Sequence, residues 1–202
     1  MKAPFSDLFK PGLPAPAQKW TGWPEFNFVG GHNDEASIPV DALKEAMDRV
    51  LTREGSTLGT YFLQSGPLGF APLREYLTDK LARYSGIKCE TDEILLTSGS
   101  LQALDLVNGL FLNAGDTVIV EESNYGGIFA KLNARSVNMV AVTVDEDGMI
   151  IDDLEAKLAD LESKSIKPKY IYTIPTVHNP TGTILTLERR LRLIEIAKSK
   201  QI

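Results

Sequence analysis

The residues most suited to binding a small polar ligand lie at 177–182, with the sequence VHNPTG. Pro180 disfavours a helical backbone at Asn179, and the Thr-Gly pair that follows permits a tight turn. The amide of Asn179 is therefore expected to be held in an exposed position, where it can donate to a ring oxygen or a carboxylate. The alternative is a generic Asn-Pro turn with no ligand.

Two further stretches have similar potential. Residues 97–102, TSGSLQ, carry small residues and hydroxyls before a predicted helix, and the N–H groups at a helix N-terminus suit a phosphate. The alternative is that Ser98 or Ser100 simply caps that helix. Residues 122–127, ESNYGG, place the ring of Tyr125 where it can stack on a planar ligand or merely pack.

All three stretches follow predicted strands. Beyond residue 90 the hydrophobic pattern alternates between strand and helix, which predicts right-handed crossovers and a mainly parallel sheet in a three-layer α-β-α arrangement. In such sheets ligands bind beyond the carboxyl ends of the strands. The predicted strands are 93–97, 117–121, 138–144 and 169–174, and the predicted helices are 101–112, 126–134, 151–162 and 187–199.

The N-terminal part is organised differently. Residues 1–36 are rich in proline, glycine and aromatic residues and predict an extended arm, whereas helical spacing of apolar residues predicts a helix at 40–53. We expect residues 1–53 to form the arm and part of a small domain, and residues 54–202 to form the main α/β domain. Ile202 resembles the first residue of a further strand, so we expect this domain to be incomplete at its C-terminus.

Composition narrows the function. The net charge of −6, with both signs interspersed, offers no basic stripe for nucleic acid. The single cysteine, Cys89, excludes an intrachain disulfide and fits a reducing compartment, and with only two histidines the spacing suits no metal site. No segment has the length and apolarity of a signal core or a membrane span. A cytoplasmic protein is expected.

Together the three stretches resemble the class I/II aminotransferases, which are fold-type-I enzymes dependent on pyridoxal phosphate (PLP). The resemblance extends from about Gly30 to the end, and residues 69–74, GFAPLR, are similar to the family's Gly-x-x-x-Leu-Arg signature. The pair Gly30-Gly31 resembles the segment that lies over the substrate in the subfamily of 2-aminoadipate, aromatic and branched-chain aminotransferases. The resemblance implies a homodimer that transfers an amino group between an amino acid and a 2-oxo acid.

The resemblance also implies roles for individual residues. Asn179 would donate to the 3-hydroxyl oxygen of PLP and help orient the substrate carboxylate, and Gly31 would contact the substrate. Tyr125 would stack on the pyridine ring. The cofactor phosphate would be held by Gly99, Ser100, Leu101 and Gln102. Leu101 stands where relatives usually have glutamine, so only its backbone N–H can serve the phosphate.

Some expected parts have no counterpart. The tyrosine that reaches the partner subunit's cofactor is missing before Gly69, and Tyr61 is the nearest substitute. The Schiff-base lysine and the aspartate that binds the pyridine nitrogen are expected beyond Ile202, so no catalytic residue is assigned. His178 is interpreted as structural and His32 as polar surface. Two alternatives remain: an aminotransferase-like ligand sensor of a transcription regulator, and a PLP-dependent lyase or decarboxylase of the same fold.

Overall fold

The computed structural model describes residues 8–9, 21–22, 25–26, 30–60 and 65–202. The chain divides into two units, residues 1–61 and 62–202, and each is considered by itself. Most of the predicted N-terminal arm and Tyr61 lie outside the described residues. Within the described ranges, no helix is long and apolar enough to cross a membrane.

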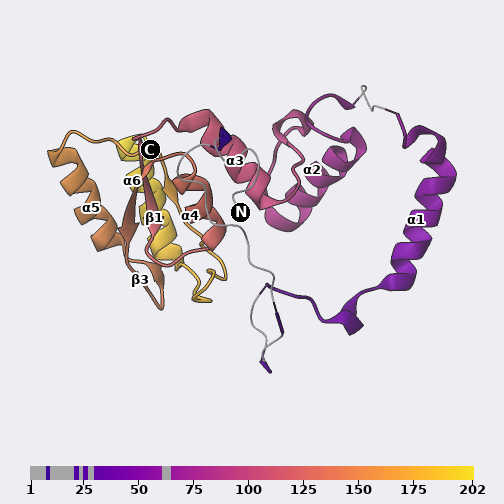
Figure 1. Cartoon of the computed structure of the whole chain (residues 1–202), viewed down its shortest axis with the longest axis horizontal. Helices are drawn as coiled ribbons and strands as arrows, with labels where there is room; N and C mark the ends of the chain where they lie inside the picture. Colours follow the sequence, from indigo (N-terminus) through magenta and orange to yellow (C-terminus); the bar gives the residue numbers. More distant parts are fainter. Residues whose placement is uncertain (1–7, 10–20, 23–24, 27–29, 61–64) are drawn as a thin grey trace. The chain divides into compact units, whose positions relative to one another are not determined.

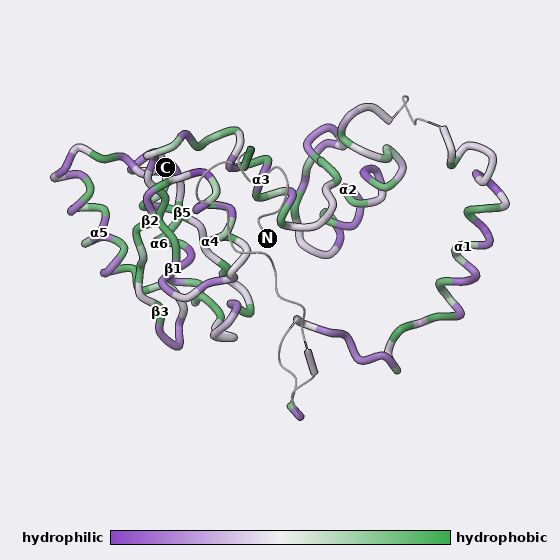
Figure 2. Tube along the Cα trace, viewed as in Figure 1, coloured by the Kyte–Doolittle hydropathy of each residue, from purple (hydrophilic) through white to green (hydrophobic). Residues whose placement is uncertain are grey.

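The first unit contains the predicted first helix. The helix α1 spans Val40–Glu54 and is flanked by the 3-10 turns η2, Glu35–Ser37, and η3, Gly55–Thr57. Its apolar side chains recur every three or four residues, so that green and purple segments alternate along α1 in Figure 2. These side chains stay exposed, by 57% at Leu43 and 60% at Met47.

The second unit contains the predicted alternation of strands and helices (Figure 1). The α-helices are α2 (Ala71–Ser85), α3 (Ser100–Phe111), α4 (Gly126–Asn133), α5 (Ile151–Ser163) and α6 (Leu187–Lys200). The strands are β1 (Thr117–Glu121), β2 (Asn138–Val142), β3 (Val144–Asp145), β4 (Gly148–Met149) and β5 (Ile171–Tyr172), and the 3-10 turn η5 spans Thr91–Glu93.

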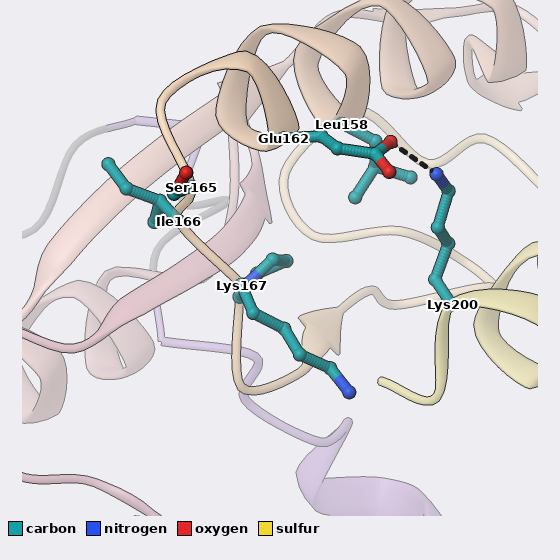
Figure 3. A pocket seen from close by; sticks show the side chains of 7 residues that line it. Leu158, Glu162, Ser165, Ile166, Lys167 and Lys200 are labelled. Carbon is teal, nitrogen blue, oxygen red and sulfur yellow. Dashed lines mark hydrogen bonds and ion pairs between the residues drawn. The ribbon is translucent and has the colours of Figure 1, made fainter.

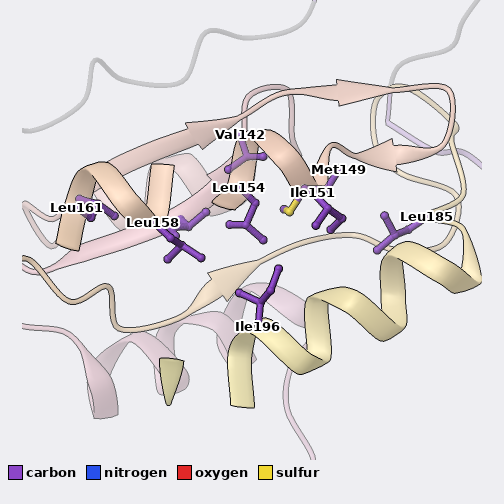
Figure 4. Close-up of a cluster of buried hydrophobic side chains, with 9 residues drawn as sticks. Val142, Met149, Ile151, Leu154, Leu158, Leu161, Leu185 and Ile196 are labelled. Atoms are coloured by element: carbon purple, nitrogen blue, oxygen red, sulfur yellow. The ribbon is translucent and has the colours of Figure 1, made fainter. Parts of the chain in front are cut away.

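The central strand β1 organises the unit. It pairs in parallel with β2 on one side and β5 on the other. Its side chains alternate between faces, so Val118 and Val120 pack with α4 while Ile119 packs with α5 and α6. Figure 4 shows the second of these clusters, with Leu154 and Ile196 pointing toward one another between the two helices. The parallel sheet with helices on both faces confirms the predicted three-layer α-β-α fold.

Three predicted strands are wrong in part. Residues 94–97 follow η5 as extended backbone but pair with no strand in the described part of the chain; Leu96 N donates only to Leu68 O, at 2.9 Å. The predicted strand 138–144 breaks at Thr143, because Asp153 of α5 accepts the Thr143 N–H at 2.8 Å. The chain then forms the short antiparallel hairpin β3–β4, which the sequence did not predict.

The last strand and the chain end also differ from expectation. Only Ile171 and Tyr172 of the predicted strand 169–174 are paired as a strand, although Ile119 N still donates to Tyr170 O at 3.1 Å. Ile202 is not in a strand. It packs against the cluster of α5 and α6 as a half-buried side chain, after Gln201 has ended α6 in a left-handed conformation.

Candidate functional site

The carboxyl ends of the neighbouring strands β1 and β5 are where this topology favours a ligand. These strands are neighbours, yet the chain leaves β1 toward α4 on one face and leaves β5 toward α6 on the other. The two connecting loops therefore leave this edge of the sheet toward opposite faces, and the edge between them is the position at which parallel α/β sheets bind ligands. Two of the three candidate stretches lie in these loops.

A buried glutamate closes the end of β1. Glu121 is 1% exposed, and its Oε2 accepts a hydrogen bond from Nδ2 of Asn124 at 2.8 Å. The other side of the Asn124 amide, Oδ1, accepts the backbone N–H of Tyr125 at 2.7 Å. The start of α4, where Tyr125 occupies the N-cap position, is thereby tied to the end of the strand.

The loop after β5 is tied to the same carboxylate. Thr173 Oγ1 donates to Glu121 Oε1 at 2.6 Å, and the backbone N–H of Ile174 donates to Glu121 Oε2 at 3.1 Å. The ring of His178, 3% exposed, brings Nε2 within 3.0 Å of Glu121 Oε2, at an angle that does not make a hydrogen bond. Buried charge is tolerated in proteins where such donors surround it.

A tight turn presents Asn179. His178 N donates to Thr183 O at 2.8 Å and Gly182 N donates back to His178 O at 2.6 Å, while His178 Nδ1 lies 2.8 Å from Thr181 Oγ1. Asn179, which precedes a cis peptide bond, is exposed at the top of this turn. The buried His178 agrees with its interpretation as structural.

The third stretch opens α3. Gly99 is the N-cap residue, with φ of 80°, and no side chain caps the helix. The alternative of a Ser98 or Ser100 cap is therefore wrong. The side chain of Gln102 instead accepts the backbone N–H of Ser98. The first turn of α3 keeps its N–H groups without a side-chain acceptor, as an anion site requires.

Gly127 shows that this stretch meets the Tyr125 loop. A Cβ built on Gly127 would lie 2.6 Å from Tyr125 Cζ and 2.7 Å from Leu101 Cδ2. The two side chains thus converge on a space that only glycine leaves open. Burial raises the pKa of Tyr172 on β5, and the nearby Glu121 and Tyr125 raise it further.

A continuous series of contacts connects the three loops that carry the predicted residues. Leu101 reaches Tyr125 over Gly127, and Tyr125 reaches the Asn179 turn through the Glu121 network. Gly31 belongs to the first unit, so its role stays a prediction. Sequence reasoning missed Glu121. The feature of the sequence that could have indicated it is a carboxylate as the last residue of the mainly apolar strand TVIVE.

A separate hollow lies at the opposite end of the sheet. It is lined by Leu158 of α5, by residues 165–168 that follow this helix, and by the Glu162–Lys200 ion pair of 2.6 Å (Figure 3). The adjoining Lys169 donates its N–H to Thr117 O, at the amino end of β1. Ligands of parallel sheets bind at the other end, so this hollow is not part of the candidate site.

Comparisons with known proteins identify the family. The sequence profile of class I and II aminotransferases matches residues 27–202. The chain is 36% identical to aromatic-amino-acid aminotransferase 1 of Thermococcus litoralis over 85% of its own length and 40% of that protein's. It is 33% identical to the 2-aminoadipate transaminase of Thermus thermophilus, over 86% and 40%.

Solved structures give the same result. The crystal structure of the Pyrococcus horikoshii kynurenine aminotransferase, in complex with PMP, superposes with a TM-score of 0.78 at 33% identity, covering 85% of this chain and 42% of that one. LysN, the alpha-aminoadipate aminotransferase of Thermus thermophilus, superposes with a TM-score of 0.74 at 32% identity, over 87% and 41%. This chain spans about two fifths of the length of these relatives. The chain belongs to the class I and II aminotransferase family.

Proposed function

We propose that the protein, in its full length, is a PLP-dependent aminotransferase that transfers an amino group between an amino acid and a 2-oxo acid. The observation that carries this proposal is the linkage of three loops at one end of the sheet, through Leu101, Tyr125 and the Glu121 network. Each loop offers a different kind of group: free N–H donors, an aromatic ring and an exposed amide. Together these match the phosphate, ring and oxygen substituent of one planar cofactor.

The residues fit PLP in the following way. The backbone of Gly99, Ser100, Leu101 and Gln102 at the uncapped start of α3 would hold the phosphate. Tyr125 would stack on the pyridine ring, and Asn179 would donate to the ring oxygen and steer the substrate carboxylate. The closeness of Leu101 and Tyr125 over Gly127 supports this layout. When bound, PLP supplies an electron sink for bond changes at the α-carbon of an amino acid.

Substrates, assembly and location belong to the same proposal. Relatives named for aromatic amino acids, 2-aminoadipate and kynurenine support an amino acid of one of these kinds as the amino donor. We propose a homodimer in the cytoplasm, with Gly31 contacting the substrate. The single cysteine fits that reducing compartment. Sedimentation of the purified protein tests the dimer, because a monomer at assay concentrations would contradict it.

The deciding experiment compares reaction types in the full-length protein. Purified protein is loaded with PLP and given phenylalanine, 2-aminoadipate or leucine, with and without 2-oxoglutarate. We expect glutamate to form only when both the amino acid and 2-oxoglutarate are present. Release of carbon dioxide or ammonia without a 2-oxo acid would instead establish the lyase or decarboxylase alternative. Ligand binding with no turnover would favour the sensor.

Two variants link the activity to the proposed residues. Replacing Asn179 by alanine removes the exposed amide, and replacing Tyr125 by leucine removes the stacking ring. Each is expected to weaken PLP binding, because each removes a contact with a different part of the cofactor. Glu146→Gln, in the turn between β3 and β4, changes an exposed carboxylate that no hydrogen bond or ion pair joins to Tyr125, Asn179 or Glu121, and it serves as control. Unchanged PLP affinity in both site variants would refute the assigned roles.

A further inference from the structure

The carboxylate of Glu121 is the point at which the loop after β1 and the segment after β5 are joined. Its Oε1 accepts from Thr173 Oγ1, and its Oε2 accepts from Asn124 Nδ2 and Ile174 N. The ring of His178 lies against the same oxygen, at 3.0 Å. One donor belongs to the loop after β1 and two to the segment after β5, so this single side chain joins the two segments.

Burial makes this junction stiff. Glu121 is 1% exposed, and an ionised carboxylate removed from water is costly unless donors surround it. Any movement that parts the two loops would leave part of the carboxylate without donors in a dry site. The native spacing of the loops is therefore the one that keeps all three donors on Glu121.

We propose that Glu121 is a positioning residue that holds Tyr125 and Asn179 in fixed relative positions for the PLP ring; this inference rests on the proposed function. A single residue, Asn124, connects Glu121 to Tyr125: its side chain donates to Glu121 and accepts the backbone N–H of Tyr125. Toward Asn179, Glu121 holds the start of the same segment through Thr173 and Ile174, and the buried ring of the preceding His178 lies against it at 3.0 Å without a hydrogen bond.

A purely structural role is the competing explanation, and packing alone does not require a carboxylate here. The preceding residues Val118, Ile119 and Val120 are apolar and fully buried. A buried ionic group is often no better for stability than an apolar side chain of similar size. The hydrogen bonds of Glu121 run to the loops that carry the predicted ring contacts, whereas none runs to the start of α3.

This difference gives a selective test. In the full-length protein, Glu121→Gln keeps the shape of the side chain but removes its charge. It also replaces one acceptor oxygen by an NH2 group, which faces groups that are themselves hydrogen-bond donors. Binding of PLP is titrated by the visible circular dichroism of the bound cofactor, and inorganic phosphate is titrated as its competitor. Phosphate reports on the start of α3 alone, whereas PLP reports on the ring contacts as well. Glu146→Gln is the matched control.

We expect Glu121→Gln to raise the Kd for PLP by about tenfold or more, the effect of losing hydrogen bonds to a charged group. The Kd for phosphate should stay within about twofold of the wild-type value, since no Glu121 contact reaches that loop. The dichroism of the bound cofactor should also change, because the ring loses its fixed surroundings. Unchanged PLP affinity, or equal weakening of PLP and phosphate, overturns the proposal.

A second pair of variants decides the question if Glu121→Gln does not fold. Thr173→Val removes one donor to the carboxylate, and Thr173→Ser keeps it. Selective loss of PLP affinity in the valine variant, restored in the serine variant, supports the proposal. Equal affinities in both variants refute it. Absence of PLP binding by the wild-type protein refutes the proposed function instead.

Discussion

Replacing Gly127 by alanine probes the point where two of the candidate loops meet. The new Cβ would lie 2.6 Å from Tyr125 Cζ and 2.7 Å from Leu101 Cδ2, both far inside normal contact distance. Gly127 does not need a positive φ, so the backbone accepts alanine without strain. The substitution therefore acts by moving the ring and the leucine methyl group out of their places.

The expected energies separate stability from binding. Alanine in a helix stabilises the fold by about 0.5–1 kcal/mol relative to glycine, which offsets part of an overpacking cost of ~1–3 kcal/mol. The displaced atoms are at side-chain ends, so the unfolding free energy should change by less than about 2 kcal/mol. A lost aromatic stacking contact is worth about 0.5–1.5 kcal/mol, which corresponds to roughly a 2- to 12-fold rise in the Kd for PLP.

The neighbouring glycine is the matched control. A Cβ on Gly126 meets nothing within 4 Å, and Gly126 also lies in the first turn of α4. Gly126→Ala should leave the Kd for PLP within about twofold and raise stability slightly through helix propensity. Urea unfolding and PLP titration of both variants provide the measurements. Equal PLP affinity in the Gly126 and Gly127 variants would refute the placement of Tyr125 beside the ligand.

Three further predictions concern stability. The pKa of Asp153 is held below 3.8, chiefly because the backbone N–H of Thr143 donates to it, so its stabilising effect is present at neutral pH and lost as the pH falls below 3.8. The difference in unfolding free energy between wild type and Asp153→Asn should therefore shrink in acid; a constant difference would contradict this cause. Leu154→Ala empties a fully buried position and should cost about 2–5 kcal/mol in urea unfolding, whereas the exposed Leu191→Ala should cost under about 0.5 kcal/mol. Arg74→Lys loses the guanidinium group that donates to three backbone carbonyls from a residue only 5% exposed, and the unfolding free energy should fall by about 1–3 kcal/mol. An unchanged denaturation midpoint would show that those hydrogen bonds are dispensable.

Local patterns in the sequence predicted most of the elements. The apolar run of β1 and the spacing of α1, α5 and α6 are set by residues close in the chain, and their bounds agree with prediction to within about one residue. The identities of Tyr125 and Asn179 as candidates also came from local features, because a proline or a small-residue loop constrains its own backbone. The resemblance to aminotransferases rests on the same short motifs.

Other features depend on partners that are distant in sequence. Residues 94–97 have the composition of a strand but no neighbouring strand in the described chain, and a ladder needs two partners. The break at Thr143 arises because Asp153 takes its N–H, a competition that no residue near Thr143 reveals. The hairpin β3–β4 follows from that break.

The sequence by itself determined the layered α/β fold and the three loops proposed to bind a ligand, since periodicity and turn residues act over a few positions. Only the tertiary structure decided how the loops are joined. Glu121 and Thr173 are 52 residues apart, yet their side chains meet at 2.6 Å because β1 and β5 are neighbours in the sheet. Strand order places these groups together, and strand order is set by packing of the whole unit.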